Sequence, residues 1–414
     1  MNLIKKTTKA PAEIKPLGLY IHVPFCRSKC EYCDFYSLGG GLNNESMELY
    51  LQAVLAHIRE TAQRVVGYAV DTVYFGGGTP SFFGASGLIR ILAEIDRRFH
   101  LLKEAEITLE ANPDSAEDWK ALRALRKAGF NRISLGMQSG CDAELREIGR
   151  VHTAAQTQAA VAACRKAGFD NLSLDLIYGL PHQTMERWQE NLSAAVALQP
   201  DHLSCYGLKV EEGTPLFARR ETAGLPGDEA QADFYLYTVD FLAARGYAQY
   251  EISNFAKPGR QSRHNLKYWQ LREYAGFGPG AHSDLGGLRY AYDRSLDAYI
   301  TGVKTGSPTF SESDRIPPAD RDVEWLMLGL RTTYGLDPRD YENRFRRRFS
   351  PFLPFLNQCA QAGYAVEEEG RWHLTPRGFL LSNQIIGRML ELLQEDKRRR
   401  AEAAARGDFR IQMD

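Results

Sequence analysis

The chain has 414 residues, more than one hydrophobic core usually contains, so we expect one large domain and a smaller one. Its 44% hydrophobic and 25% charged residues are typical of a soluble globular protein, and a net charge of -1 argues against bulk electrostatic binding to nucleic acid or membrane. No apolar run approaches the roughly 20 residues of a membrane-spanning helix, and residues 1–16 lack the apolar stretch of a secretory signal.

Strand-like and helix-like segments alternate through the first 250 residues. Helices separating apolar, β-branched strands are typical of parallel β/α units. A weak repeat supports this: "RKAGFNRISLGM" begins at Arg126 and "RKAGFDNLSLDL" at Arg165, 39 residues later. We predict an α/β fold with a full or partial TIM-like barrel over 1–250, with a doubly wound open sheet as the alternative. The predicted strands are 17–23, 70–75, 106–111, 132–137, 172–178 and 202–208, and the predicted helices are 44–66, 86–99, 115–128, 153–167, 184–198 and 228–245.

The remaining sequence changes character. Residues 251–310 are rich in Gly, aromatic and polar residues and are predicted to form an irregular cover. Residues 311–414 begin as a linker, and then predict amphipathic helices, two short strands around a turn and a further helix. We expect a small α+β, winged-helix-like domain there, ending in a solvated, charged helical tail.

The sequence "RFRRRF" (344–349) is the one dense basic run. Its simplest interpretation is a solvated helix face. Contact with a propionate, an acidic partner or a membrane surface are the alternatives. Nucleic acid is disfavoured by the net charge and by the absence of a base-reading motif.

Polar or glycine-rich residues follow all six predicted strands. Because sites in such folds form at the carboxyl ends of the strands, we expect these residues to meet at one rim. In chain order they are Cys26, Cys30 and Cys33; "GGGTP" (76–80); Glu110; Gln138; Asp175; and Tyr206 with Gly207.

The three cysteines are spaced C-x3-C-x2-C, which lets one loop surround one metal centre. A structural zinc site needs a fourth ligand, and no paired Cys or His follows in the sequence. A [4Fe-4S] cluster takes one thiolate per iron, so three cysteines leave one iron open. The pattern favours the cluster, with zinc or core cysteines as alternatives. The other four cysteines (Cys141, Cys164, Cys205, Cys359) are scattered, which indicates a reducing, cytoplasmic setting.

The glycines of "GGGTP" allow a ligand to approach the backbone closely. The segment lacks the Lys of a P-loop and the spacing of a dinucleotide fingerprint. Taken alone, it is equally well a tight turn with Thr79 as a helix cap.

Together, the cysteine motif and "GGGTP" resemble the radical S-adenosylmethionine (SAM) superfamily. The segments "LYIHVPFC", "LEANP", "GMQS", "GRVHT", "DLIYGLP" and "GFGPGAHS" resemble the oxygen-independent coproporphyrinogen III oxidase group, called HemN-like. "CDF" and "HNLKYW" (264–269) are most similar to the HemW-type heme chaperones within it. The oxidases carry a further cysteine where this chain has Phe35, and a longer N-terminal arm.

The resemblance implies a [4Fe-4S] cluster whose open iron is chelated by SAM. A first SAM would contact Tyr20, Gly77, Glu110 and His282. In the oxidases a second SAM is contacted at the positions of Tyr32, Gly78, Thr79, Gln138, Arg150, Asp175 and Gly207.

Heme is the second ligand that the resemblance implies. His264 is the preferred iron ligand because His is the usual heme ligand and "HNLKYW" supplies aromatic surface. The heme candidates are His264, Asn265, Tyr268 and Trp269. His22, His282 and Cys205 are weaker ligand candidates, the first two because the cluster loop and SAM account for them.

We therefore expect a cytoplasmic heme chaperone that passes heme to an acceptor hemoprotein of unknown identity. Peripheral membrane contact is an additional expectation, and nucleic-acid binding is not expected. The alternatives are coproporphyrinogen III oxidation, with decarboxylation of two propionates, and another radical-SAM modification of a porphyrin. The residue Phe35 and the short N-terminus favour the chaperone.

Overall fold

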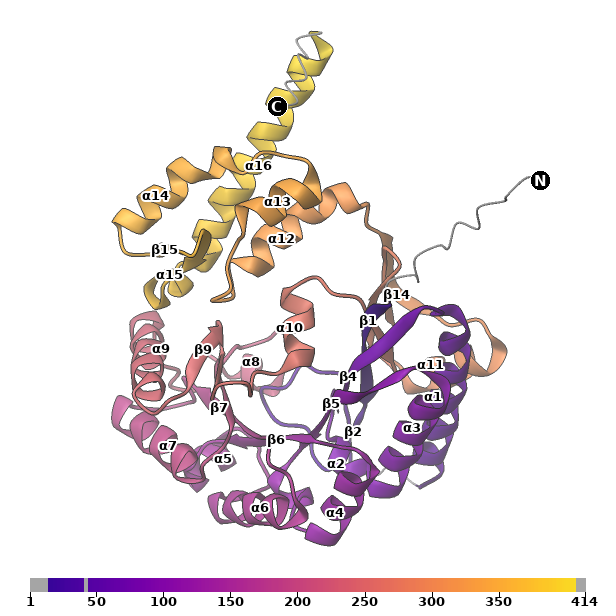
Figure 1. The fold of residues 1–414 in the computed structure, drawn as a ribbon. Coiled ribbons are helices and arrows are strands. Elements are labelled where there is room, and N and C mark those ends of the chain that lie inside the picture. The colour runs from indigo at the N-terminus through magenta and orange to yellow at the C-terminus, as the bar shows by residue number, and fades with distance from the viewer. Residues whose placement is uncertain (1–13, 41–43, 407–414) are drawn as a thin grey trace, which may run out of the picture.

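The computed structural model describes residues 14–40 and 44–406. Most of residues 1–16, where no secretory signal is expected, and the end of the predicted tail lie outside these ranges. All six predicted strands are present, each within a few residues of its expected bounds (Figure 1). They are β1 (Lys15–Val23), β4 (Tyr68–Gly77), β5 (Leu101–Ala111), β6 (Arg132–Gln138), β7 (Leu172–Tyr178) and β8 (His202–Gly207).

The six strands lie in the sheet in chain order, β1-β4-β5-β6-β7-β8, and each pairs with the next in parallel. A doubly wound sheet reverses its strand order at a switch point, so this alternative is wrong. The arrangement is a partial β/α barrel, with the helices outside an arc of strands (Figure 1). The outer helices are α1 (Asn44–Arg64), α3 (Ala85–Arg98), α4 (Trp119–Ala128), α6 (Ala154–Ala167), α7 (Met185–Ala197) and α9 (Asp228–Ala243).

Alternation along each strand gives the sheet two different faces. Leu19 and Ile21 of β1, and Val73 and Phe75 of β4, belong to the fully buried core. The intervening residues of these and the other barrel strands are largely polar. Because successive side chains point to opposite faces, the helices cover an apolar surface while the barrel interior is polar. The interior can therefore hold a polar or charged ligand.

The segment 251–310 differs from its prediction, because it contains regular elements rather than an irregular cover. Two strands, β9 (Ala248–Glu251) and β10 (Asn254–Ala256), extend the sheet beyond β8. At the other edge β11 (Tyr274–Phe277) pairs with β1 in parallel and continues into antiparallel strands. These are β12 (His282–Leu285), β13 (Leu288–Tyr292) and β14 (Phe310–Arg315), with α11 (Leu296–Thr305) between the last two. Short Gly-rich strands carry a weak sequence signal, and their pairing partners are far away in the chain.

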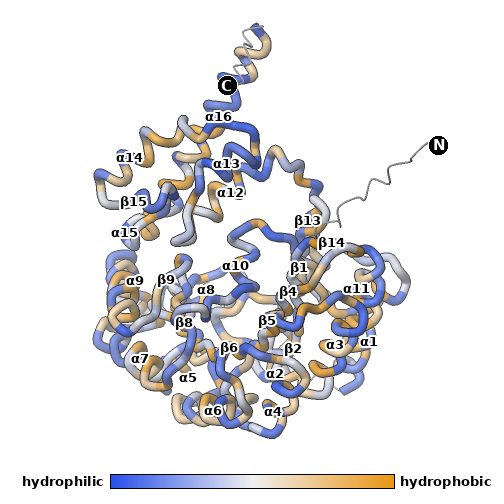
Figure 2. Tube along the Cα trace, viewed as in Figure 1, coloured by the Kyte–Doolittle hydropathy of each residue, from blue (hydrophilic) through white to orange (hydrophobic). Residues whose placement is uncertain are grey.

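Helix α10 (Arg263–Trp269) carries the "HNLKYW" sequence and lies within the arc of strands (Figure 1). Figure 2 shows it as a largely hydrophilic element there. Glu106 of β5 accepts the backbone N–H groups of Arg263 and His264, both at 3.0 Å. An acidic side chain at a helix N-terminus satisfies free N–H groups and the helix dipole, so it fixes this helix against the barrel.

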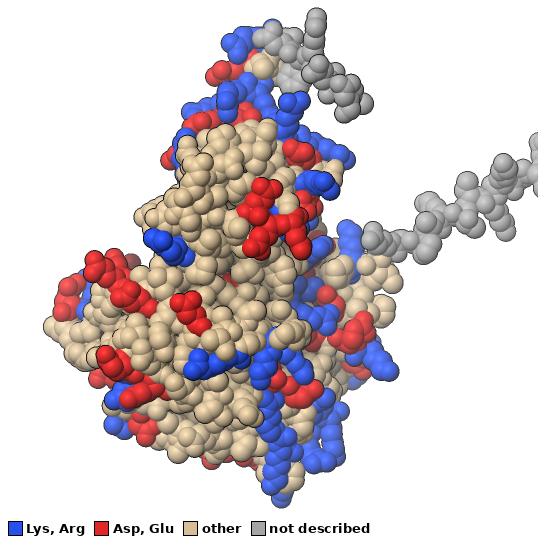
Figure 3. Space-filling model, turned by 60° about the vertical axis from the view of Figure 1, so that its left-hand side comes forward, with Lys and Arg blue, Asp and Glu red and all other residues tan. Residues whose placement is uncertain are grey.

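The C-terminal region has its own core, packed around buried residues of α12 (Arg321–Gly329), α13 (Pro338–Phe345), α14 (Leu353–Gln361) and α16 (Ser382–Ala405). The predicted strand pair is the antiparallel hairpin of β15 (Ala365–Glu368) and β16 (Arg371–Leu374), followed by α15 (Pro376–Leu380). The far end of α16 projects from the molecule, and mostly basic side chains lie there (Figure 3). No helix within the described ranges is long and apolar enough to cross a membrane.

The "RFRRRF" run is not a continuous solvated helix face. Helix α13 ends at Phe345, and Arg346 adopts a left-handed conformation with φ 54°. Phe345 and Phe349 are buried in the C-terminal core, and Arg347 pairs with the buried Asp322. Part of this basic run thus stabilises the domain internally.

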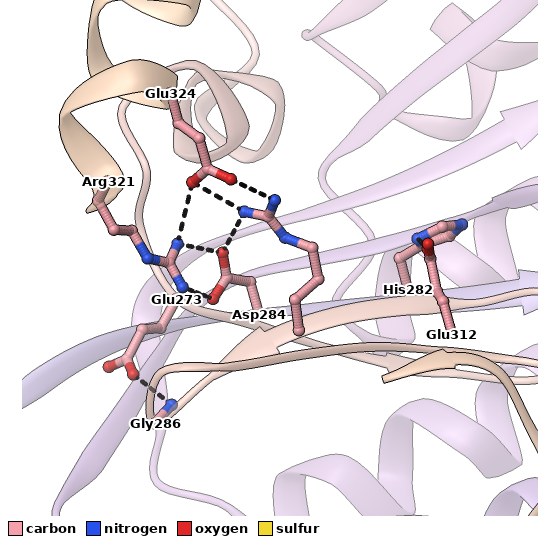
Figure 4. A network of polar contacts seen from close by, with 8 residues as sticks. Glu273, His282, Asp284, Gly286, Glu312, Arg321 and Glu324 are labelled. Atoms are coloured by element: carbon pink, nitrogen blue, oxygen red, sulfur yellow. Dashed lines mark hydrogen bonds and ion pairs between the residues drawn. The ribbon is translucent and has the colours of Figure 1, made fainter. Parts of the chain in front are cut away.

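Four charged residues connect the β12–β13 hairpin to α12 (Figure 4). Asp284 accepts hydrogen bonds from Arg289 at 2.8 Å and from Arg321 at 2.6 Å. Glu324 also pairs with Arg289. The two guanidinium groups lower the pKa of Asp284 even though burial opposes that shift. The network joins the C-terminal domain to the edge of the sheet.

Candidate functional site

The three cysteines lie in the loop that follows β1. Cys26 ends the short strand β2 (Phe25–Cys26), and Cys30 and Cys33 form a turn in which Cys33 N donates to Cys30 O at 3.3 Å. Glu31 anchors the loop, because its N–H donates to Ile148 O and its carboxylate pairs with Arg219. All three cysteines line a cavity of about 520 Å³ inside the barrel.

The surroundings of the cysteines fit an iron–sulfur cluster. All three thiols are free, and within the described residues no group of three Cys, His, Asp or Glu closes around a single metal ion. Three thiolates supply one ligand to each of three irons of a [4Fe-4S] cluster, whereas a structural zinc site needs four ligands. Thr79 Oγ1 donates to Cys26 Sγ at 3.4 Å and Arg150 Nη1 to Cys30 Sγ at 3.5 Å. Burial raises the pKa of Cys33 to about 11, so hydrogen-bond donors and bound metal are needed to hold thiolates here.

The "GGGTP" segment packs directly against the cysteine strand. Gly78 N donates to Val23 O and Thr79 N to Phe25 O, both at 2.8 Å. A Cβ on Gly78 would lie 2.8 Å from Val23 O, and one on Gly77 would lie 2.6 Å from the His22 ring, with φ already at 106°. A side chain at either position would therefore clash with the protein, so glycine is required there. Both glycines also line the cavity. Thr79 makes no side-chain cap hydrogen bond.

The predicted SAM residues from the strand ends lie around the same cavity. Arg150 Nη2 is held by Asn112 Oδ1 at 2.7 Å and Gly136 O at 2.9 Å, which orients its guanidinium. Gln138 adopts φ 60° where β6 ends. The predicted residues that line the cavity are Tyr32, Gly77, Gly78, Thr79, Glu110, Gln138, Arg150, Asp175 and Gly207.

Two carboxylates in this cavity have different environments. Glu110 accepts hydrogen bonds from Tyr74 Oη at 2.6 Å and from Gly77 N at 3.2 Å, and burial raises its pKa to about 7. Asp175 accepts from the hydroxyls of three serines, but burial still raises its pKa. These serines (Ser134, Ser173 and Ser204) were not predicted as site residues, although each occupies an alternate, inward-facing strand position.

A second cavity of about 450 Å³ adjoins the first and shares five lining residues with it: Phe35, Tyr74, Glu110, Tyr206 and Asn265. Two predicted SAM residues, Tyr20 and His282, lie here rather than beside the cysteines. The lining is mainly aromatic. Phe35 is 60% exposed and Tyr206 is 41% exposed, so two large rings face solvent where the cavities meet. Such an arrangement suits a flat apolar ligand.

Helix α10 contributes His264, Asn265 and Tyr268 to the second cavity. His264 is buried and both its ring nitrogens are engaged, by Thr72 Oγ1 at 2.9 Å and Tyr268 Oη at 2.8 Å. Burial lowers its pKa to about 3. Trp269 does not line either cavity and packs in a small cluster with Tyr250 and Leu266.

Two of the three weaker ligand candidates, His22 and Cys205, are occupied within the protein. His22 is buried and hydrogen-bonded to Tyr20 Oη at 3.1 Å and Tyr36 O at 2.8 Å, which supports the cysteine loop. Cys205 is 2% exposed and belongs to the main hydrophobic core.

Comparison with known proteins gives two family matches. The radical SAM superfamily matches residues 20–195, and the HemN C-terminal domain matches residues 316–381. The solved structure of the coproporphyrinogen III oxidase HemN from Escherichia coli, a radical SAM enzyme, superposes with a TM-score of 0.78 at 25% identity. That match covers 90% of this chain and 89% of the oxidase.

Similarity to curated relatives is more specific. The heme chaperone HemW of Mycobacterium tuberculosis (strain H37Rv) is 40% identical over 386 residues, which is 92% of this chain and 96% of the relative. HemW of Escherichia coli (strain K12) is 34% identical over 379 residues, covering 90% and 98%. The chain therefore belongs to the HemW-type heme chaperone family within the radical SAM superfamily.

Proposed function

We propose that this protein binds heme and transfers it to acceptor hemoproteins in the cytoplasm. The observation that carries the proposal is the aromatic second cavity, which opens beside the cysteine cavity with Phe35 and Tyr206 exposed at their junction. A porphyrin is flat, largely apolar and anionic at its propionates, and exposed aromatic rings can contact such a surface while it remains transferable. The proposed heme contacts on helix α10 are His264, Asn265 and Tyr268, which line the second cavity. Trp269 supports this helix by packing in its small hydrophobic cluster.

We further propose that Cys26, Cys30 and Cys33 hold a [4Fe-4S] cluster and that SAM occupies the rest of the first cavity. When bound, the cluster supplies an open iron that SAM can chelate. Glu110 can accept hydrogen bonds from a ribose or the methionine ammonium, and Arg150 can pair with the methionine carboxylate. The other proposed SAM contacts are the predicted residues that line the first cavity. Tyr20 and His282 line the second cavity and are not included among them.

The function is tested on protein reconstituted anaerobically with iron and sulfide. Titration with hemin should give saturable heme absorption, and mixing the loaded protein with an apo-hemoprotein should move that absorption to the acceptor. The same sample is incubated with SAM, a reductant and coproporphyrinogen III. Formation of protoporphyrinogen IX would show that the protein is an oxidase, and failure to bind hemin would refute the heme proposal.

SAM binding should strengthen as the pH rises through about 7. The raised pKa of Glu110 means that it is largely protonated below this value, and only the ionised form can accept hydrogen bonds from the SAM amino group or ribose with both carboxylate oxygens. Calorimetric SAM titrations between about pH 6 and about pH 8 measure the trend. Glu110→Gln should remove the pH dependence and weaken binding at the upper end. An equal pH slope in the variant would assign the trend to another group.

A further inference from the structure

His282 and Glu312 form a pair at the edge of the second cavity. His282 lies opposite Ala291 on β13, and Ala291 lies opposite Glu312 on β14, so the three side chains share one face of the sheet. The small Ala291 is 2% exposed and lets the longer side chains meet above it. His282 Nδ1 lies 3.0 Å from Glu312 Oε1 (Figure 4).

This contact fixes how the His282 ring can bind a ligand. A carboxylate oxygen accepts, so in the neutral ring Nδ1 carries the proton and Nε2 keeps its lone pair. Within the described residues Nε2 has no hydrogen-bond partner, and the side chain is 51% exposed. A histidine held by a carboxylate through one nitrogen is the usual arrangement for a metal-ligating imidazole.

The rest of the cavity provides the other groups that a porphyrin needs. Arg294 also lines it and has no carboxylate within ion-pairing distance among the described residues, so its guanidinium is available for a propionate. Tyr36 and Tyr274 add aromatic surface to that of Phe35. A cation, an unused imidazole nitrogen and aromatic rings thus line one cavity.

We propose that His282, oriented by Glu312, is an axial ligand of the heme iron, and that Arg294 pairs with a propionate. This inference rests on the proposed function. It differs from the assignment of His264, whose two nitrogens are already hydrogen-bonded to Thr72 and Tyr268. His264 instead forms the buried floor of the cavity through helix α10.

The experiment compares the reconstituted wild-type protein with His282→Ala and Glu312→Gln. Hemin is titrated into each sample while absorption and magnetic circular dichroism report the axial ligands. His282→Ala should lose the histidine signature and bind hemin at least about tenfold more weakly, and added imidazole should restore the signature. Glu312→Gln should retain the ligand but weaken binding by about tenfold.

His100→Ala is the matched control, because His100 is also exposed and lies outside both cavities. It should bind hemin as the wild type does. An unchanged heme spectrum and affinity in His282→Ala would overturn the inference while leaving the proposed function intact. A wild-type protein that fails to bind hemin would overturn both. Reduced SAM affinity with unchanged heme binding in His282→Ala would place this residue in the SAM site and also overturn the inference.

Discussion

Replacing Cys26, Cys30 or Cys33 with Ala should abolish the iron–sulfur cluster in each single variant. In the proposed cluster each thiolate would ligate one iron, and the loop offers no substitute: within the described residues, no further cysteine lines the cavity. Losing one of three ligands leaves two irons open to solvent. The expected result is loss of the cluster's visible absorption and of bound iron and sulfide after anaerobic reconstitution.

Cys141→Ala is the control for this experiment. Cys141 is also a partly buried free thiol, but it precedes α5 (Asp142–Glu147) and does not line the cavity. It should reconstitute normally. Circular dichroism should show that all four variants keep their fold, because the cysteine loop is anchored mainly through Glu31. Full iron and sulfide content in any of the three ligand variants would remove that cysteine from the set.

The barrel could be predicted from the sequence because its strands are dense runs of buried residues. Leu17, Leu19 and Ile21 of β1 are fully buried, and Leu172, Leu174 and Leu176 of β7 are as well. Such runs mark strands whatever their partners are. Parallel strands all end at the same edge of the sheet, so the position of Glu110 and Asp175 at the carboxyl-end rim of the barrel could also be expected.

The interior arrangement could not be predicted from local patterns. Glu106 and His264 are 158 residues apart, and nothing near either residue indicates that α10 enters the barrel. The strands of the 251–310 segment could not be predicted for the same reason, because their partners are distant in sequence: β11 pairs with β1 near the start of the chain. The serines around Asp175 were accessible to sequence reasoning, because strand alternation places Ser134, Ser173 and Ser204 on its face.

Heme contacts were the least predictable part of the site. The "HNLKYW" sequence identifies a helix, but only the structure shows that Thr72 and Tyr268 occupy both nitrogens of His264. The availability of a histidine for iron depends on such contacts rather than on the residue type. The pairing of His282 with Glu312 across β13 is likewise set by sheet register, which the sequence does not specify.

A second large effect is expected at Asp322, in the C-terminal domain. Its side chain is fully buried at the start of α12, where it pairs with Lys397 of α16 at 3.0 Å and with Arg347 of the "RFRRRF" run. It also accepts the Val323 N–H at 2.9 Å. One carboxylate therefore compensates two cations and joins three segments of the domain. Removing the Asp322 carboxylate leaves Arg347 and Lys397 largely buried without a negative charge to pair with.

Asp322→Ala should lower the free energy of unfolding of the C-terminal domain by about 3 kcal/mol, because an uncompensated buried charge costs more than the pair contributes. Chemical denaturation followed by tryptophan fluorescence measures this, since Trp325 and Trp372 lie in that domain. Asp322→Asn should cost less, as its amide oxygen still accepts from Lys397. Asp320→Ala, at an exposed residue that forms no ion pair with the described part of the chain, should change stability by under about 0.5 kcal/mol. Equal stability of Asp322→Ala and Asp320→Ala would show that the ion pair between Arg347 and Asp322 does not stabilise the domain. Arg347 would then be a candidate for binding an acidic partner.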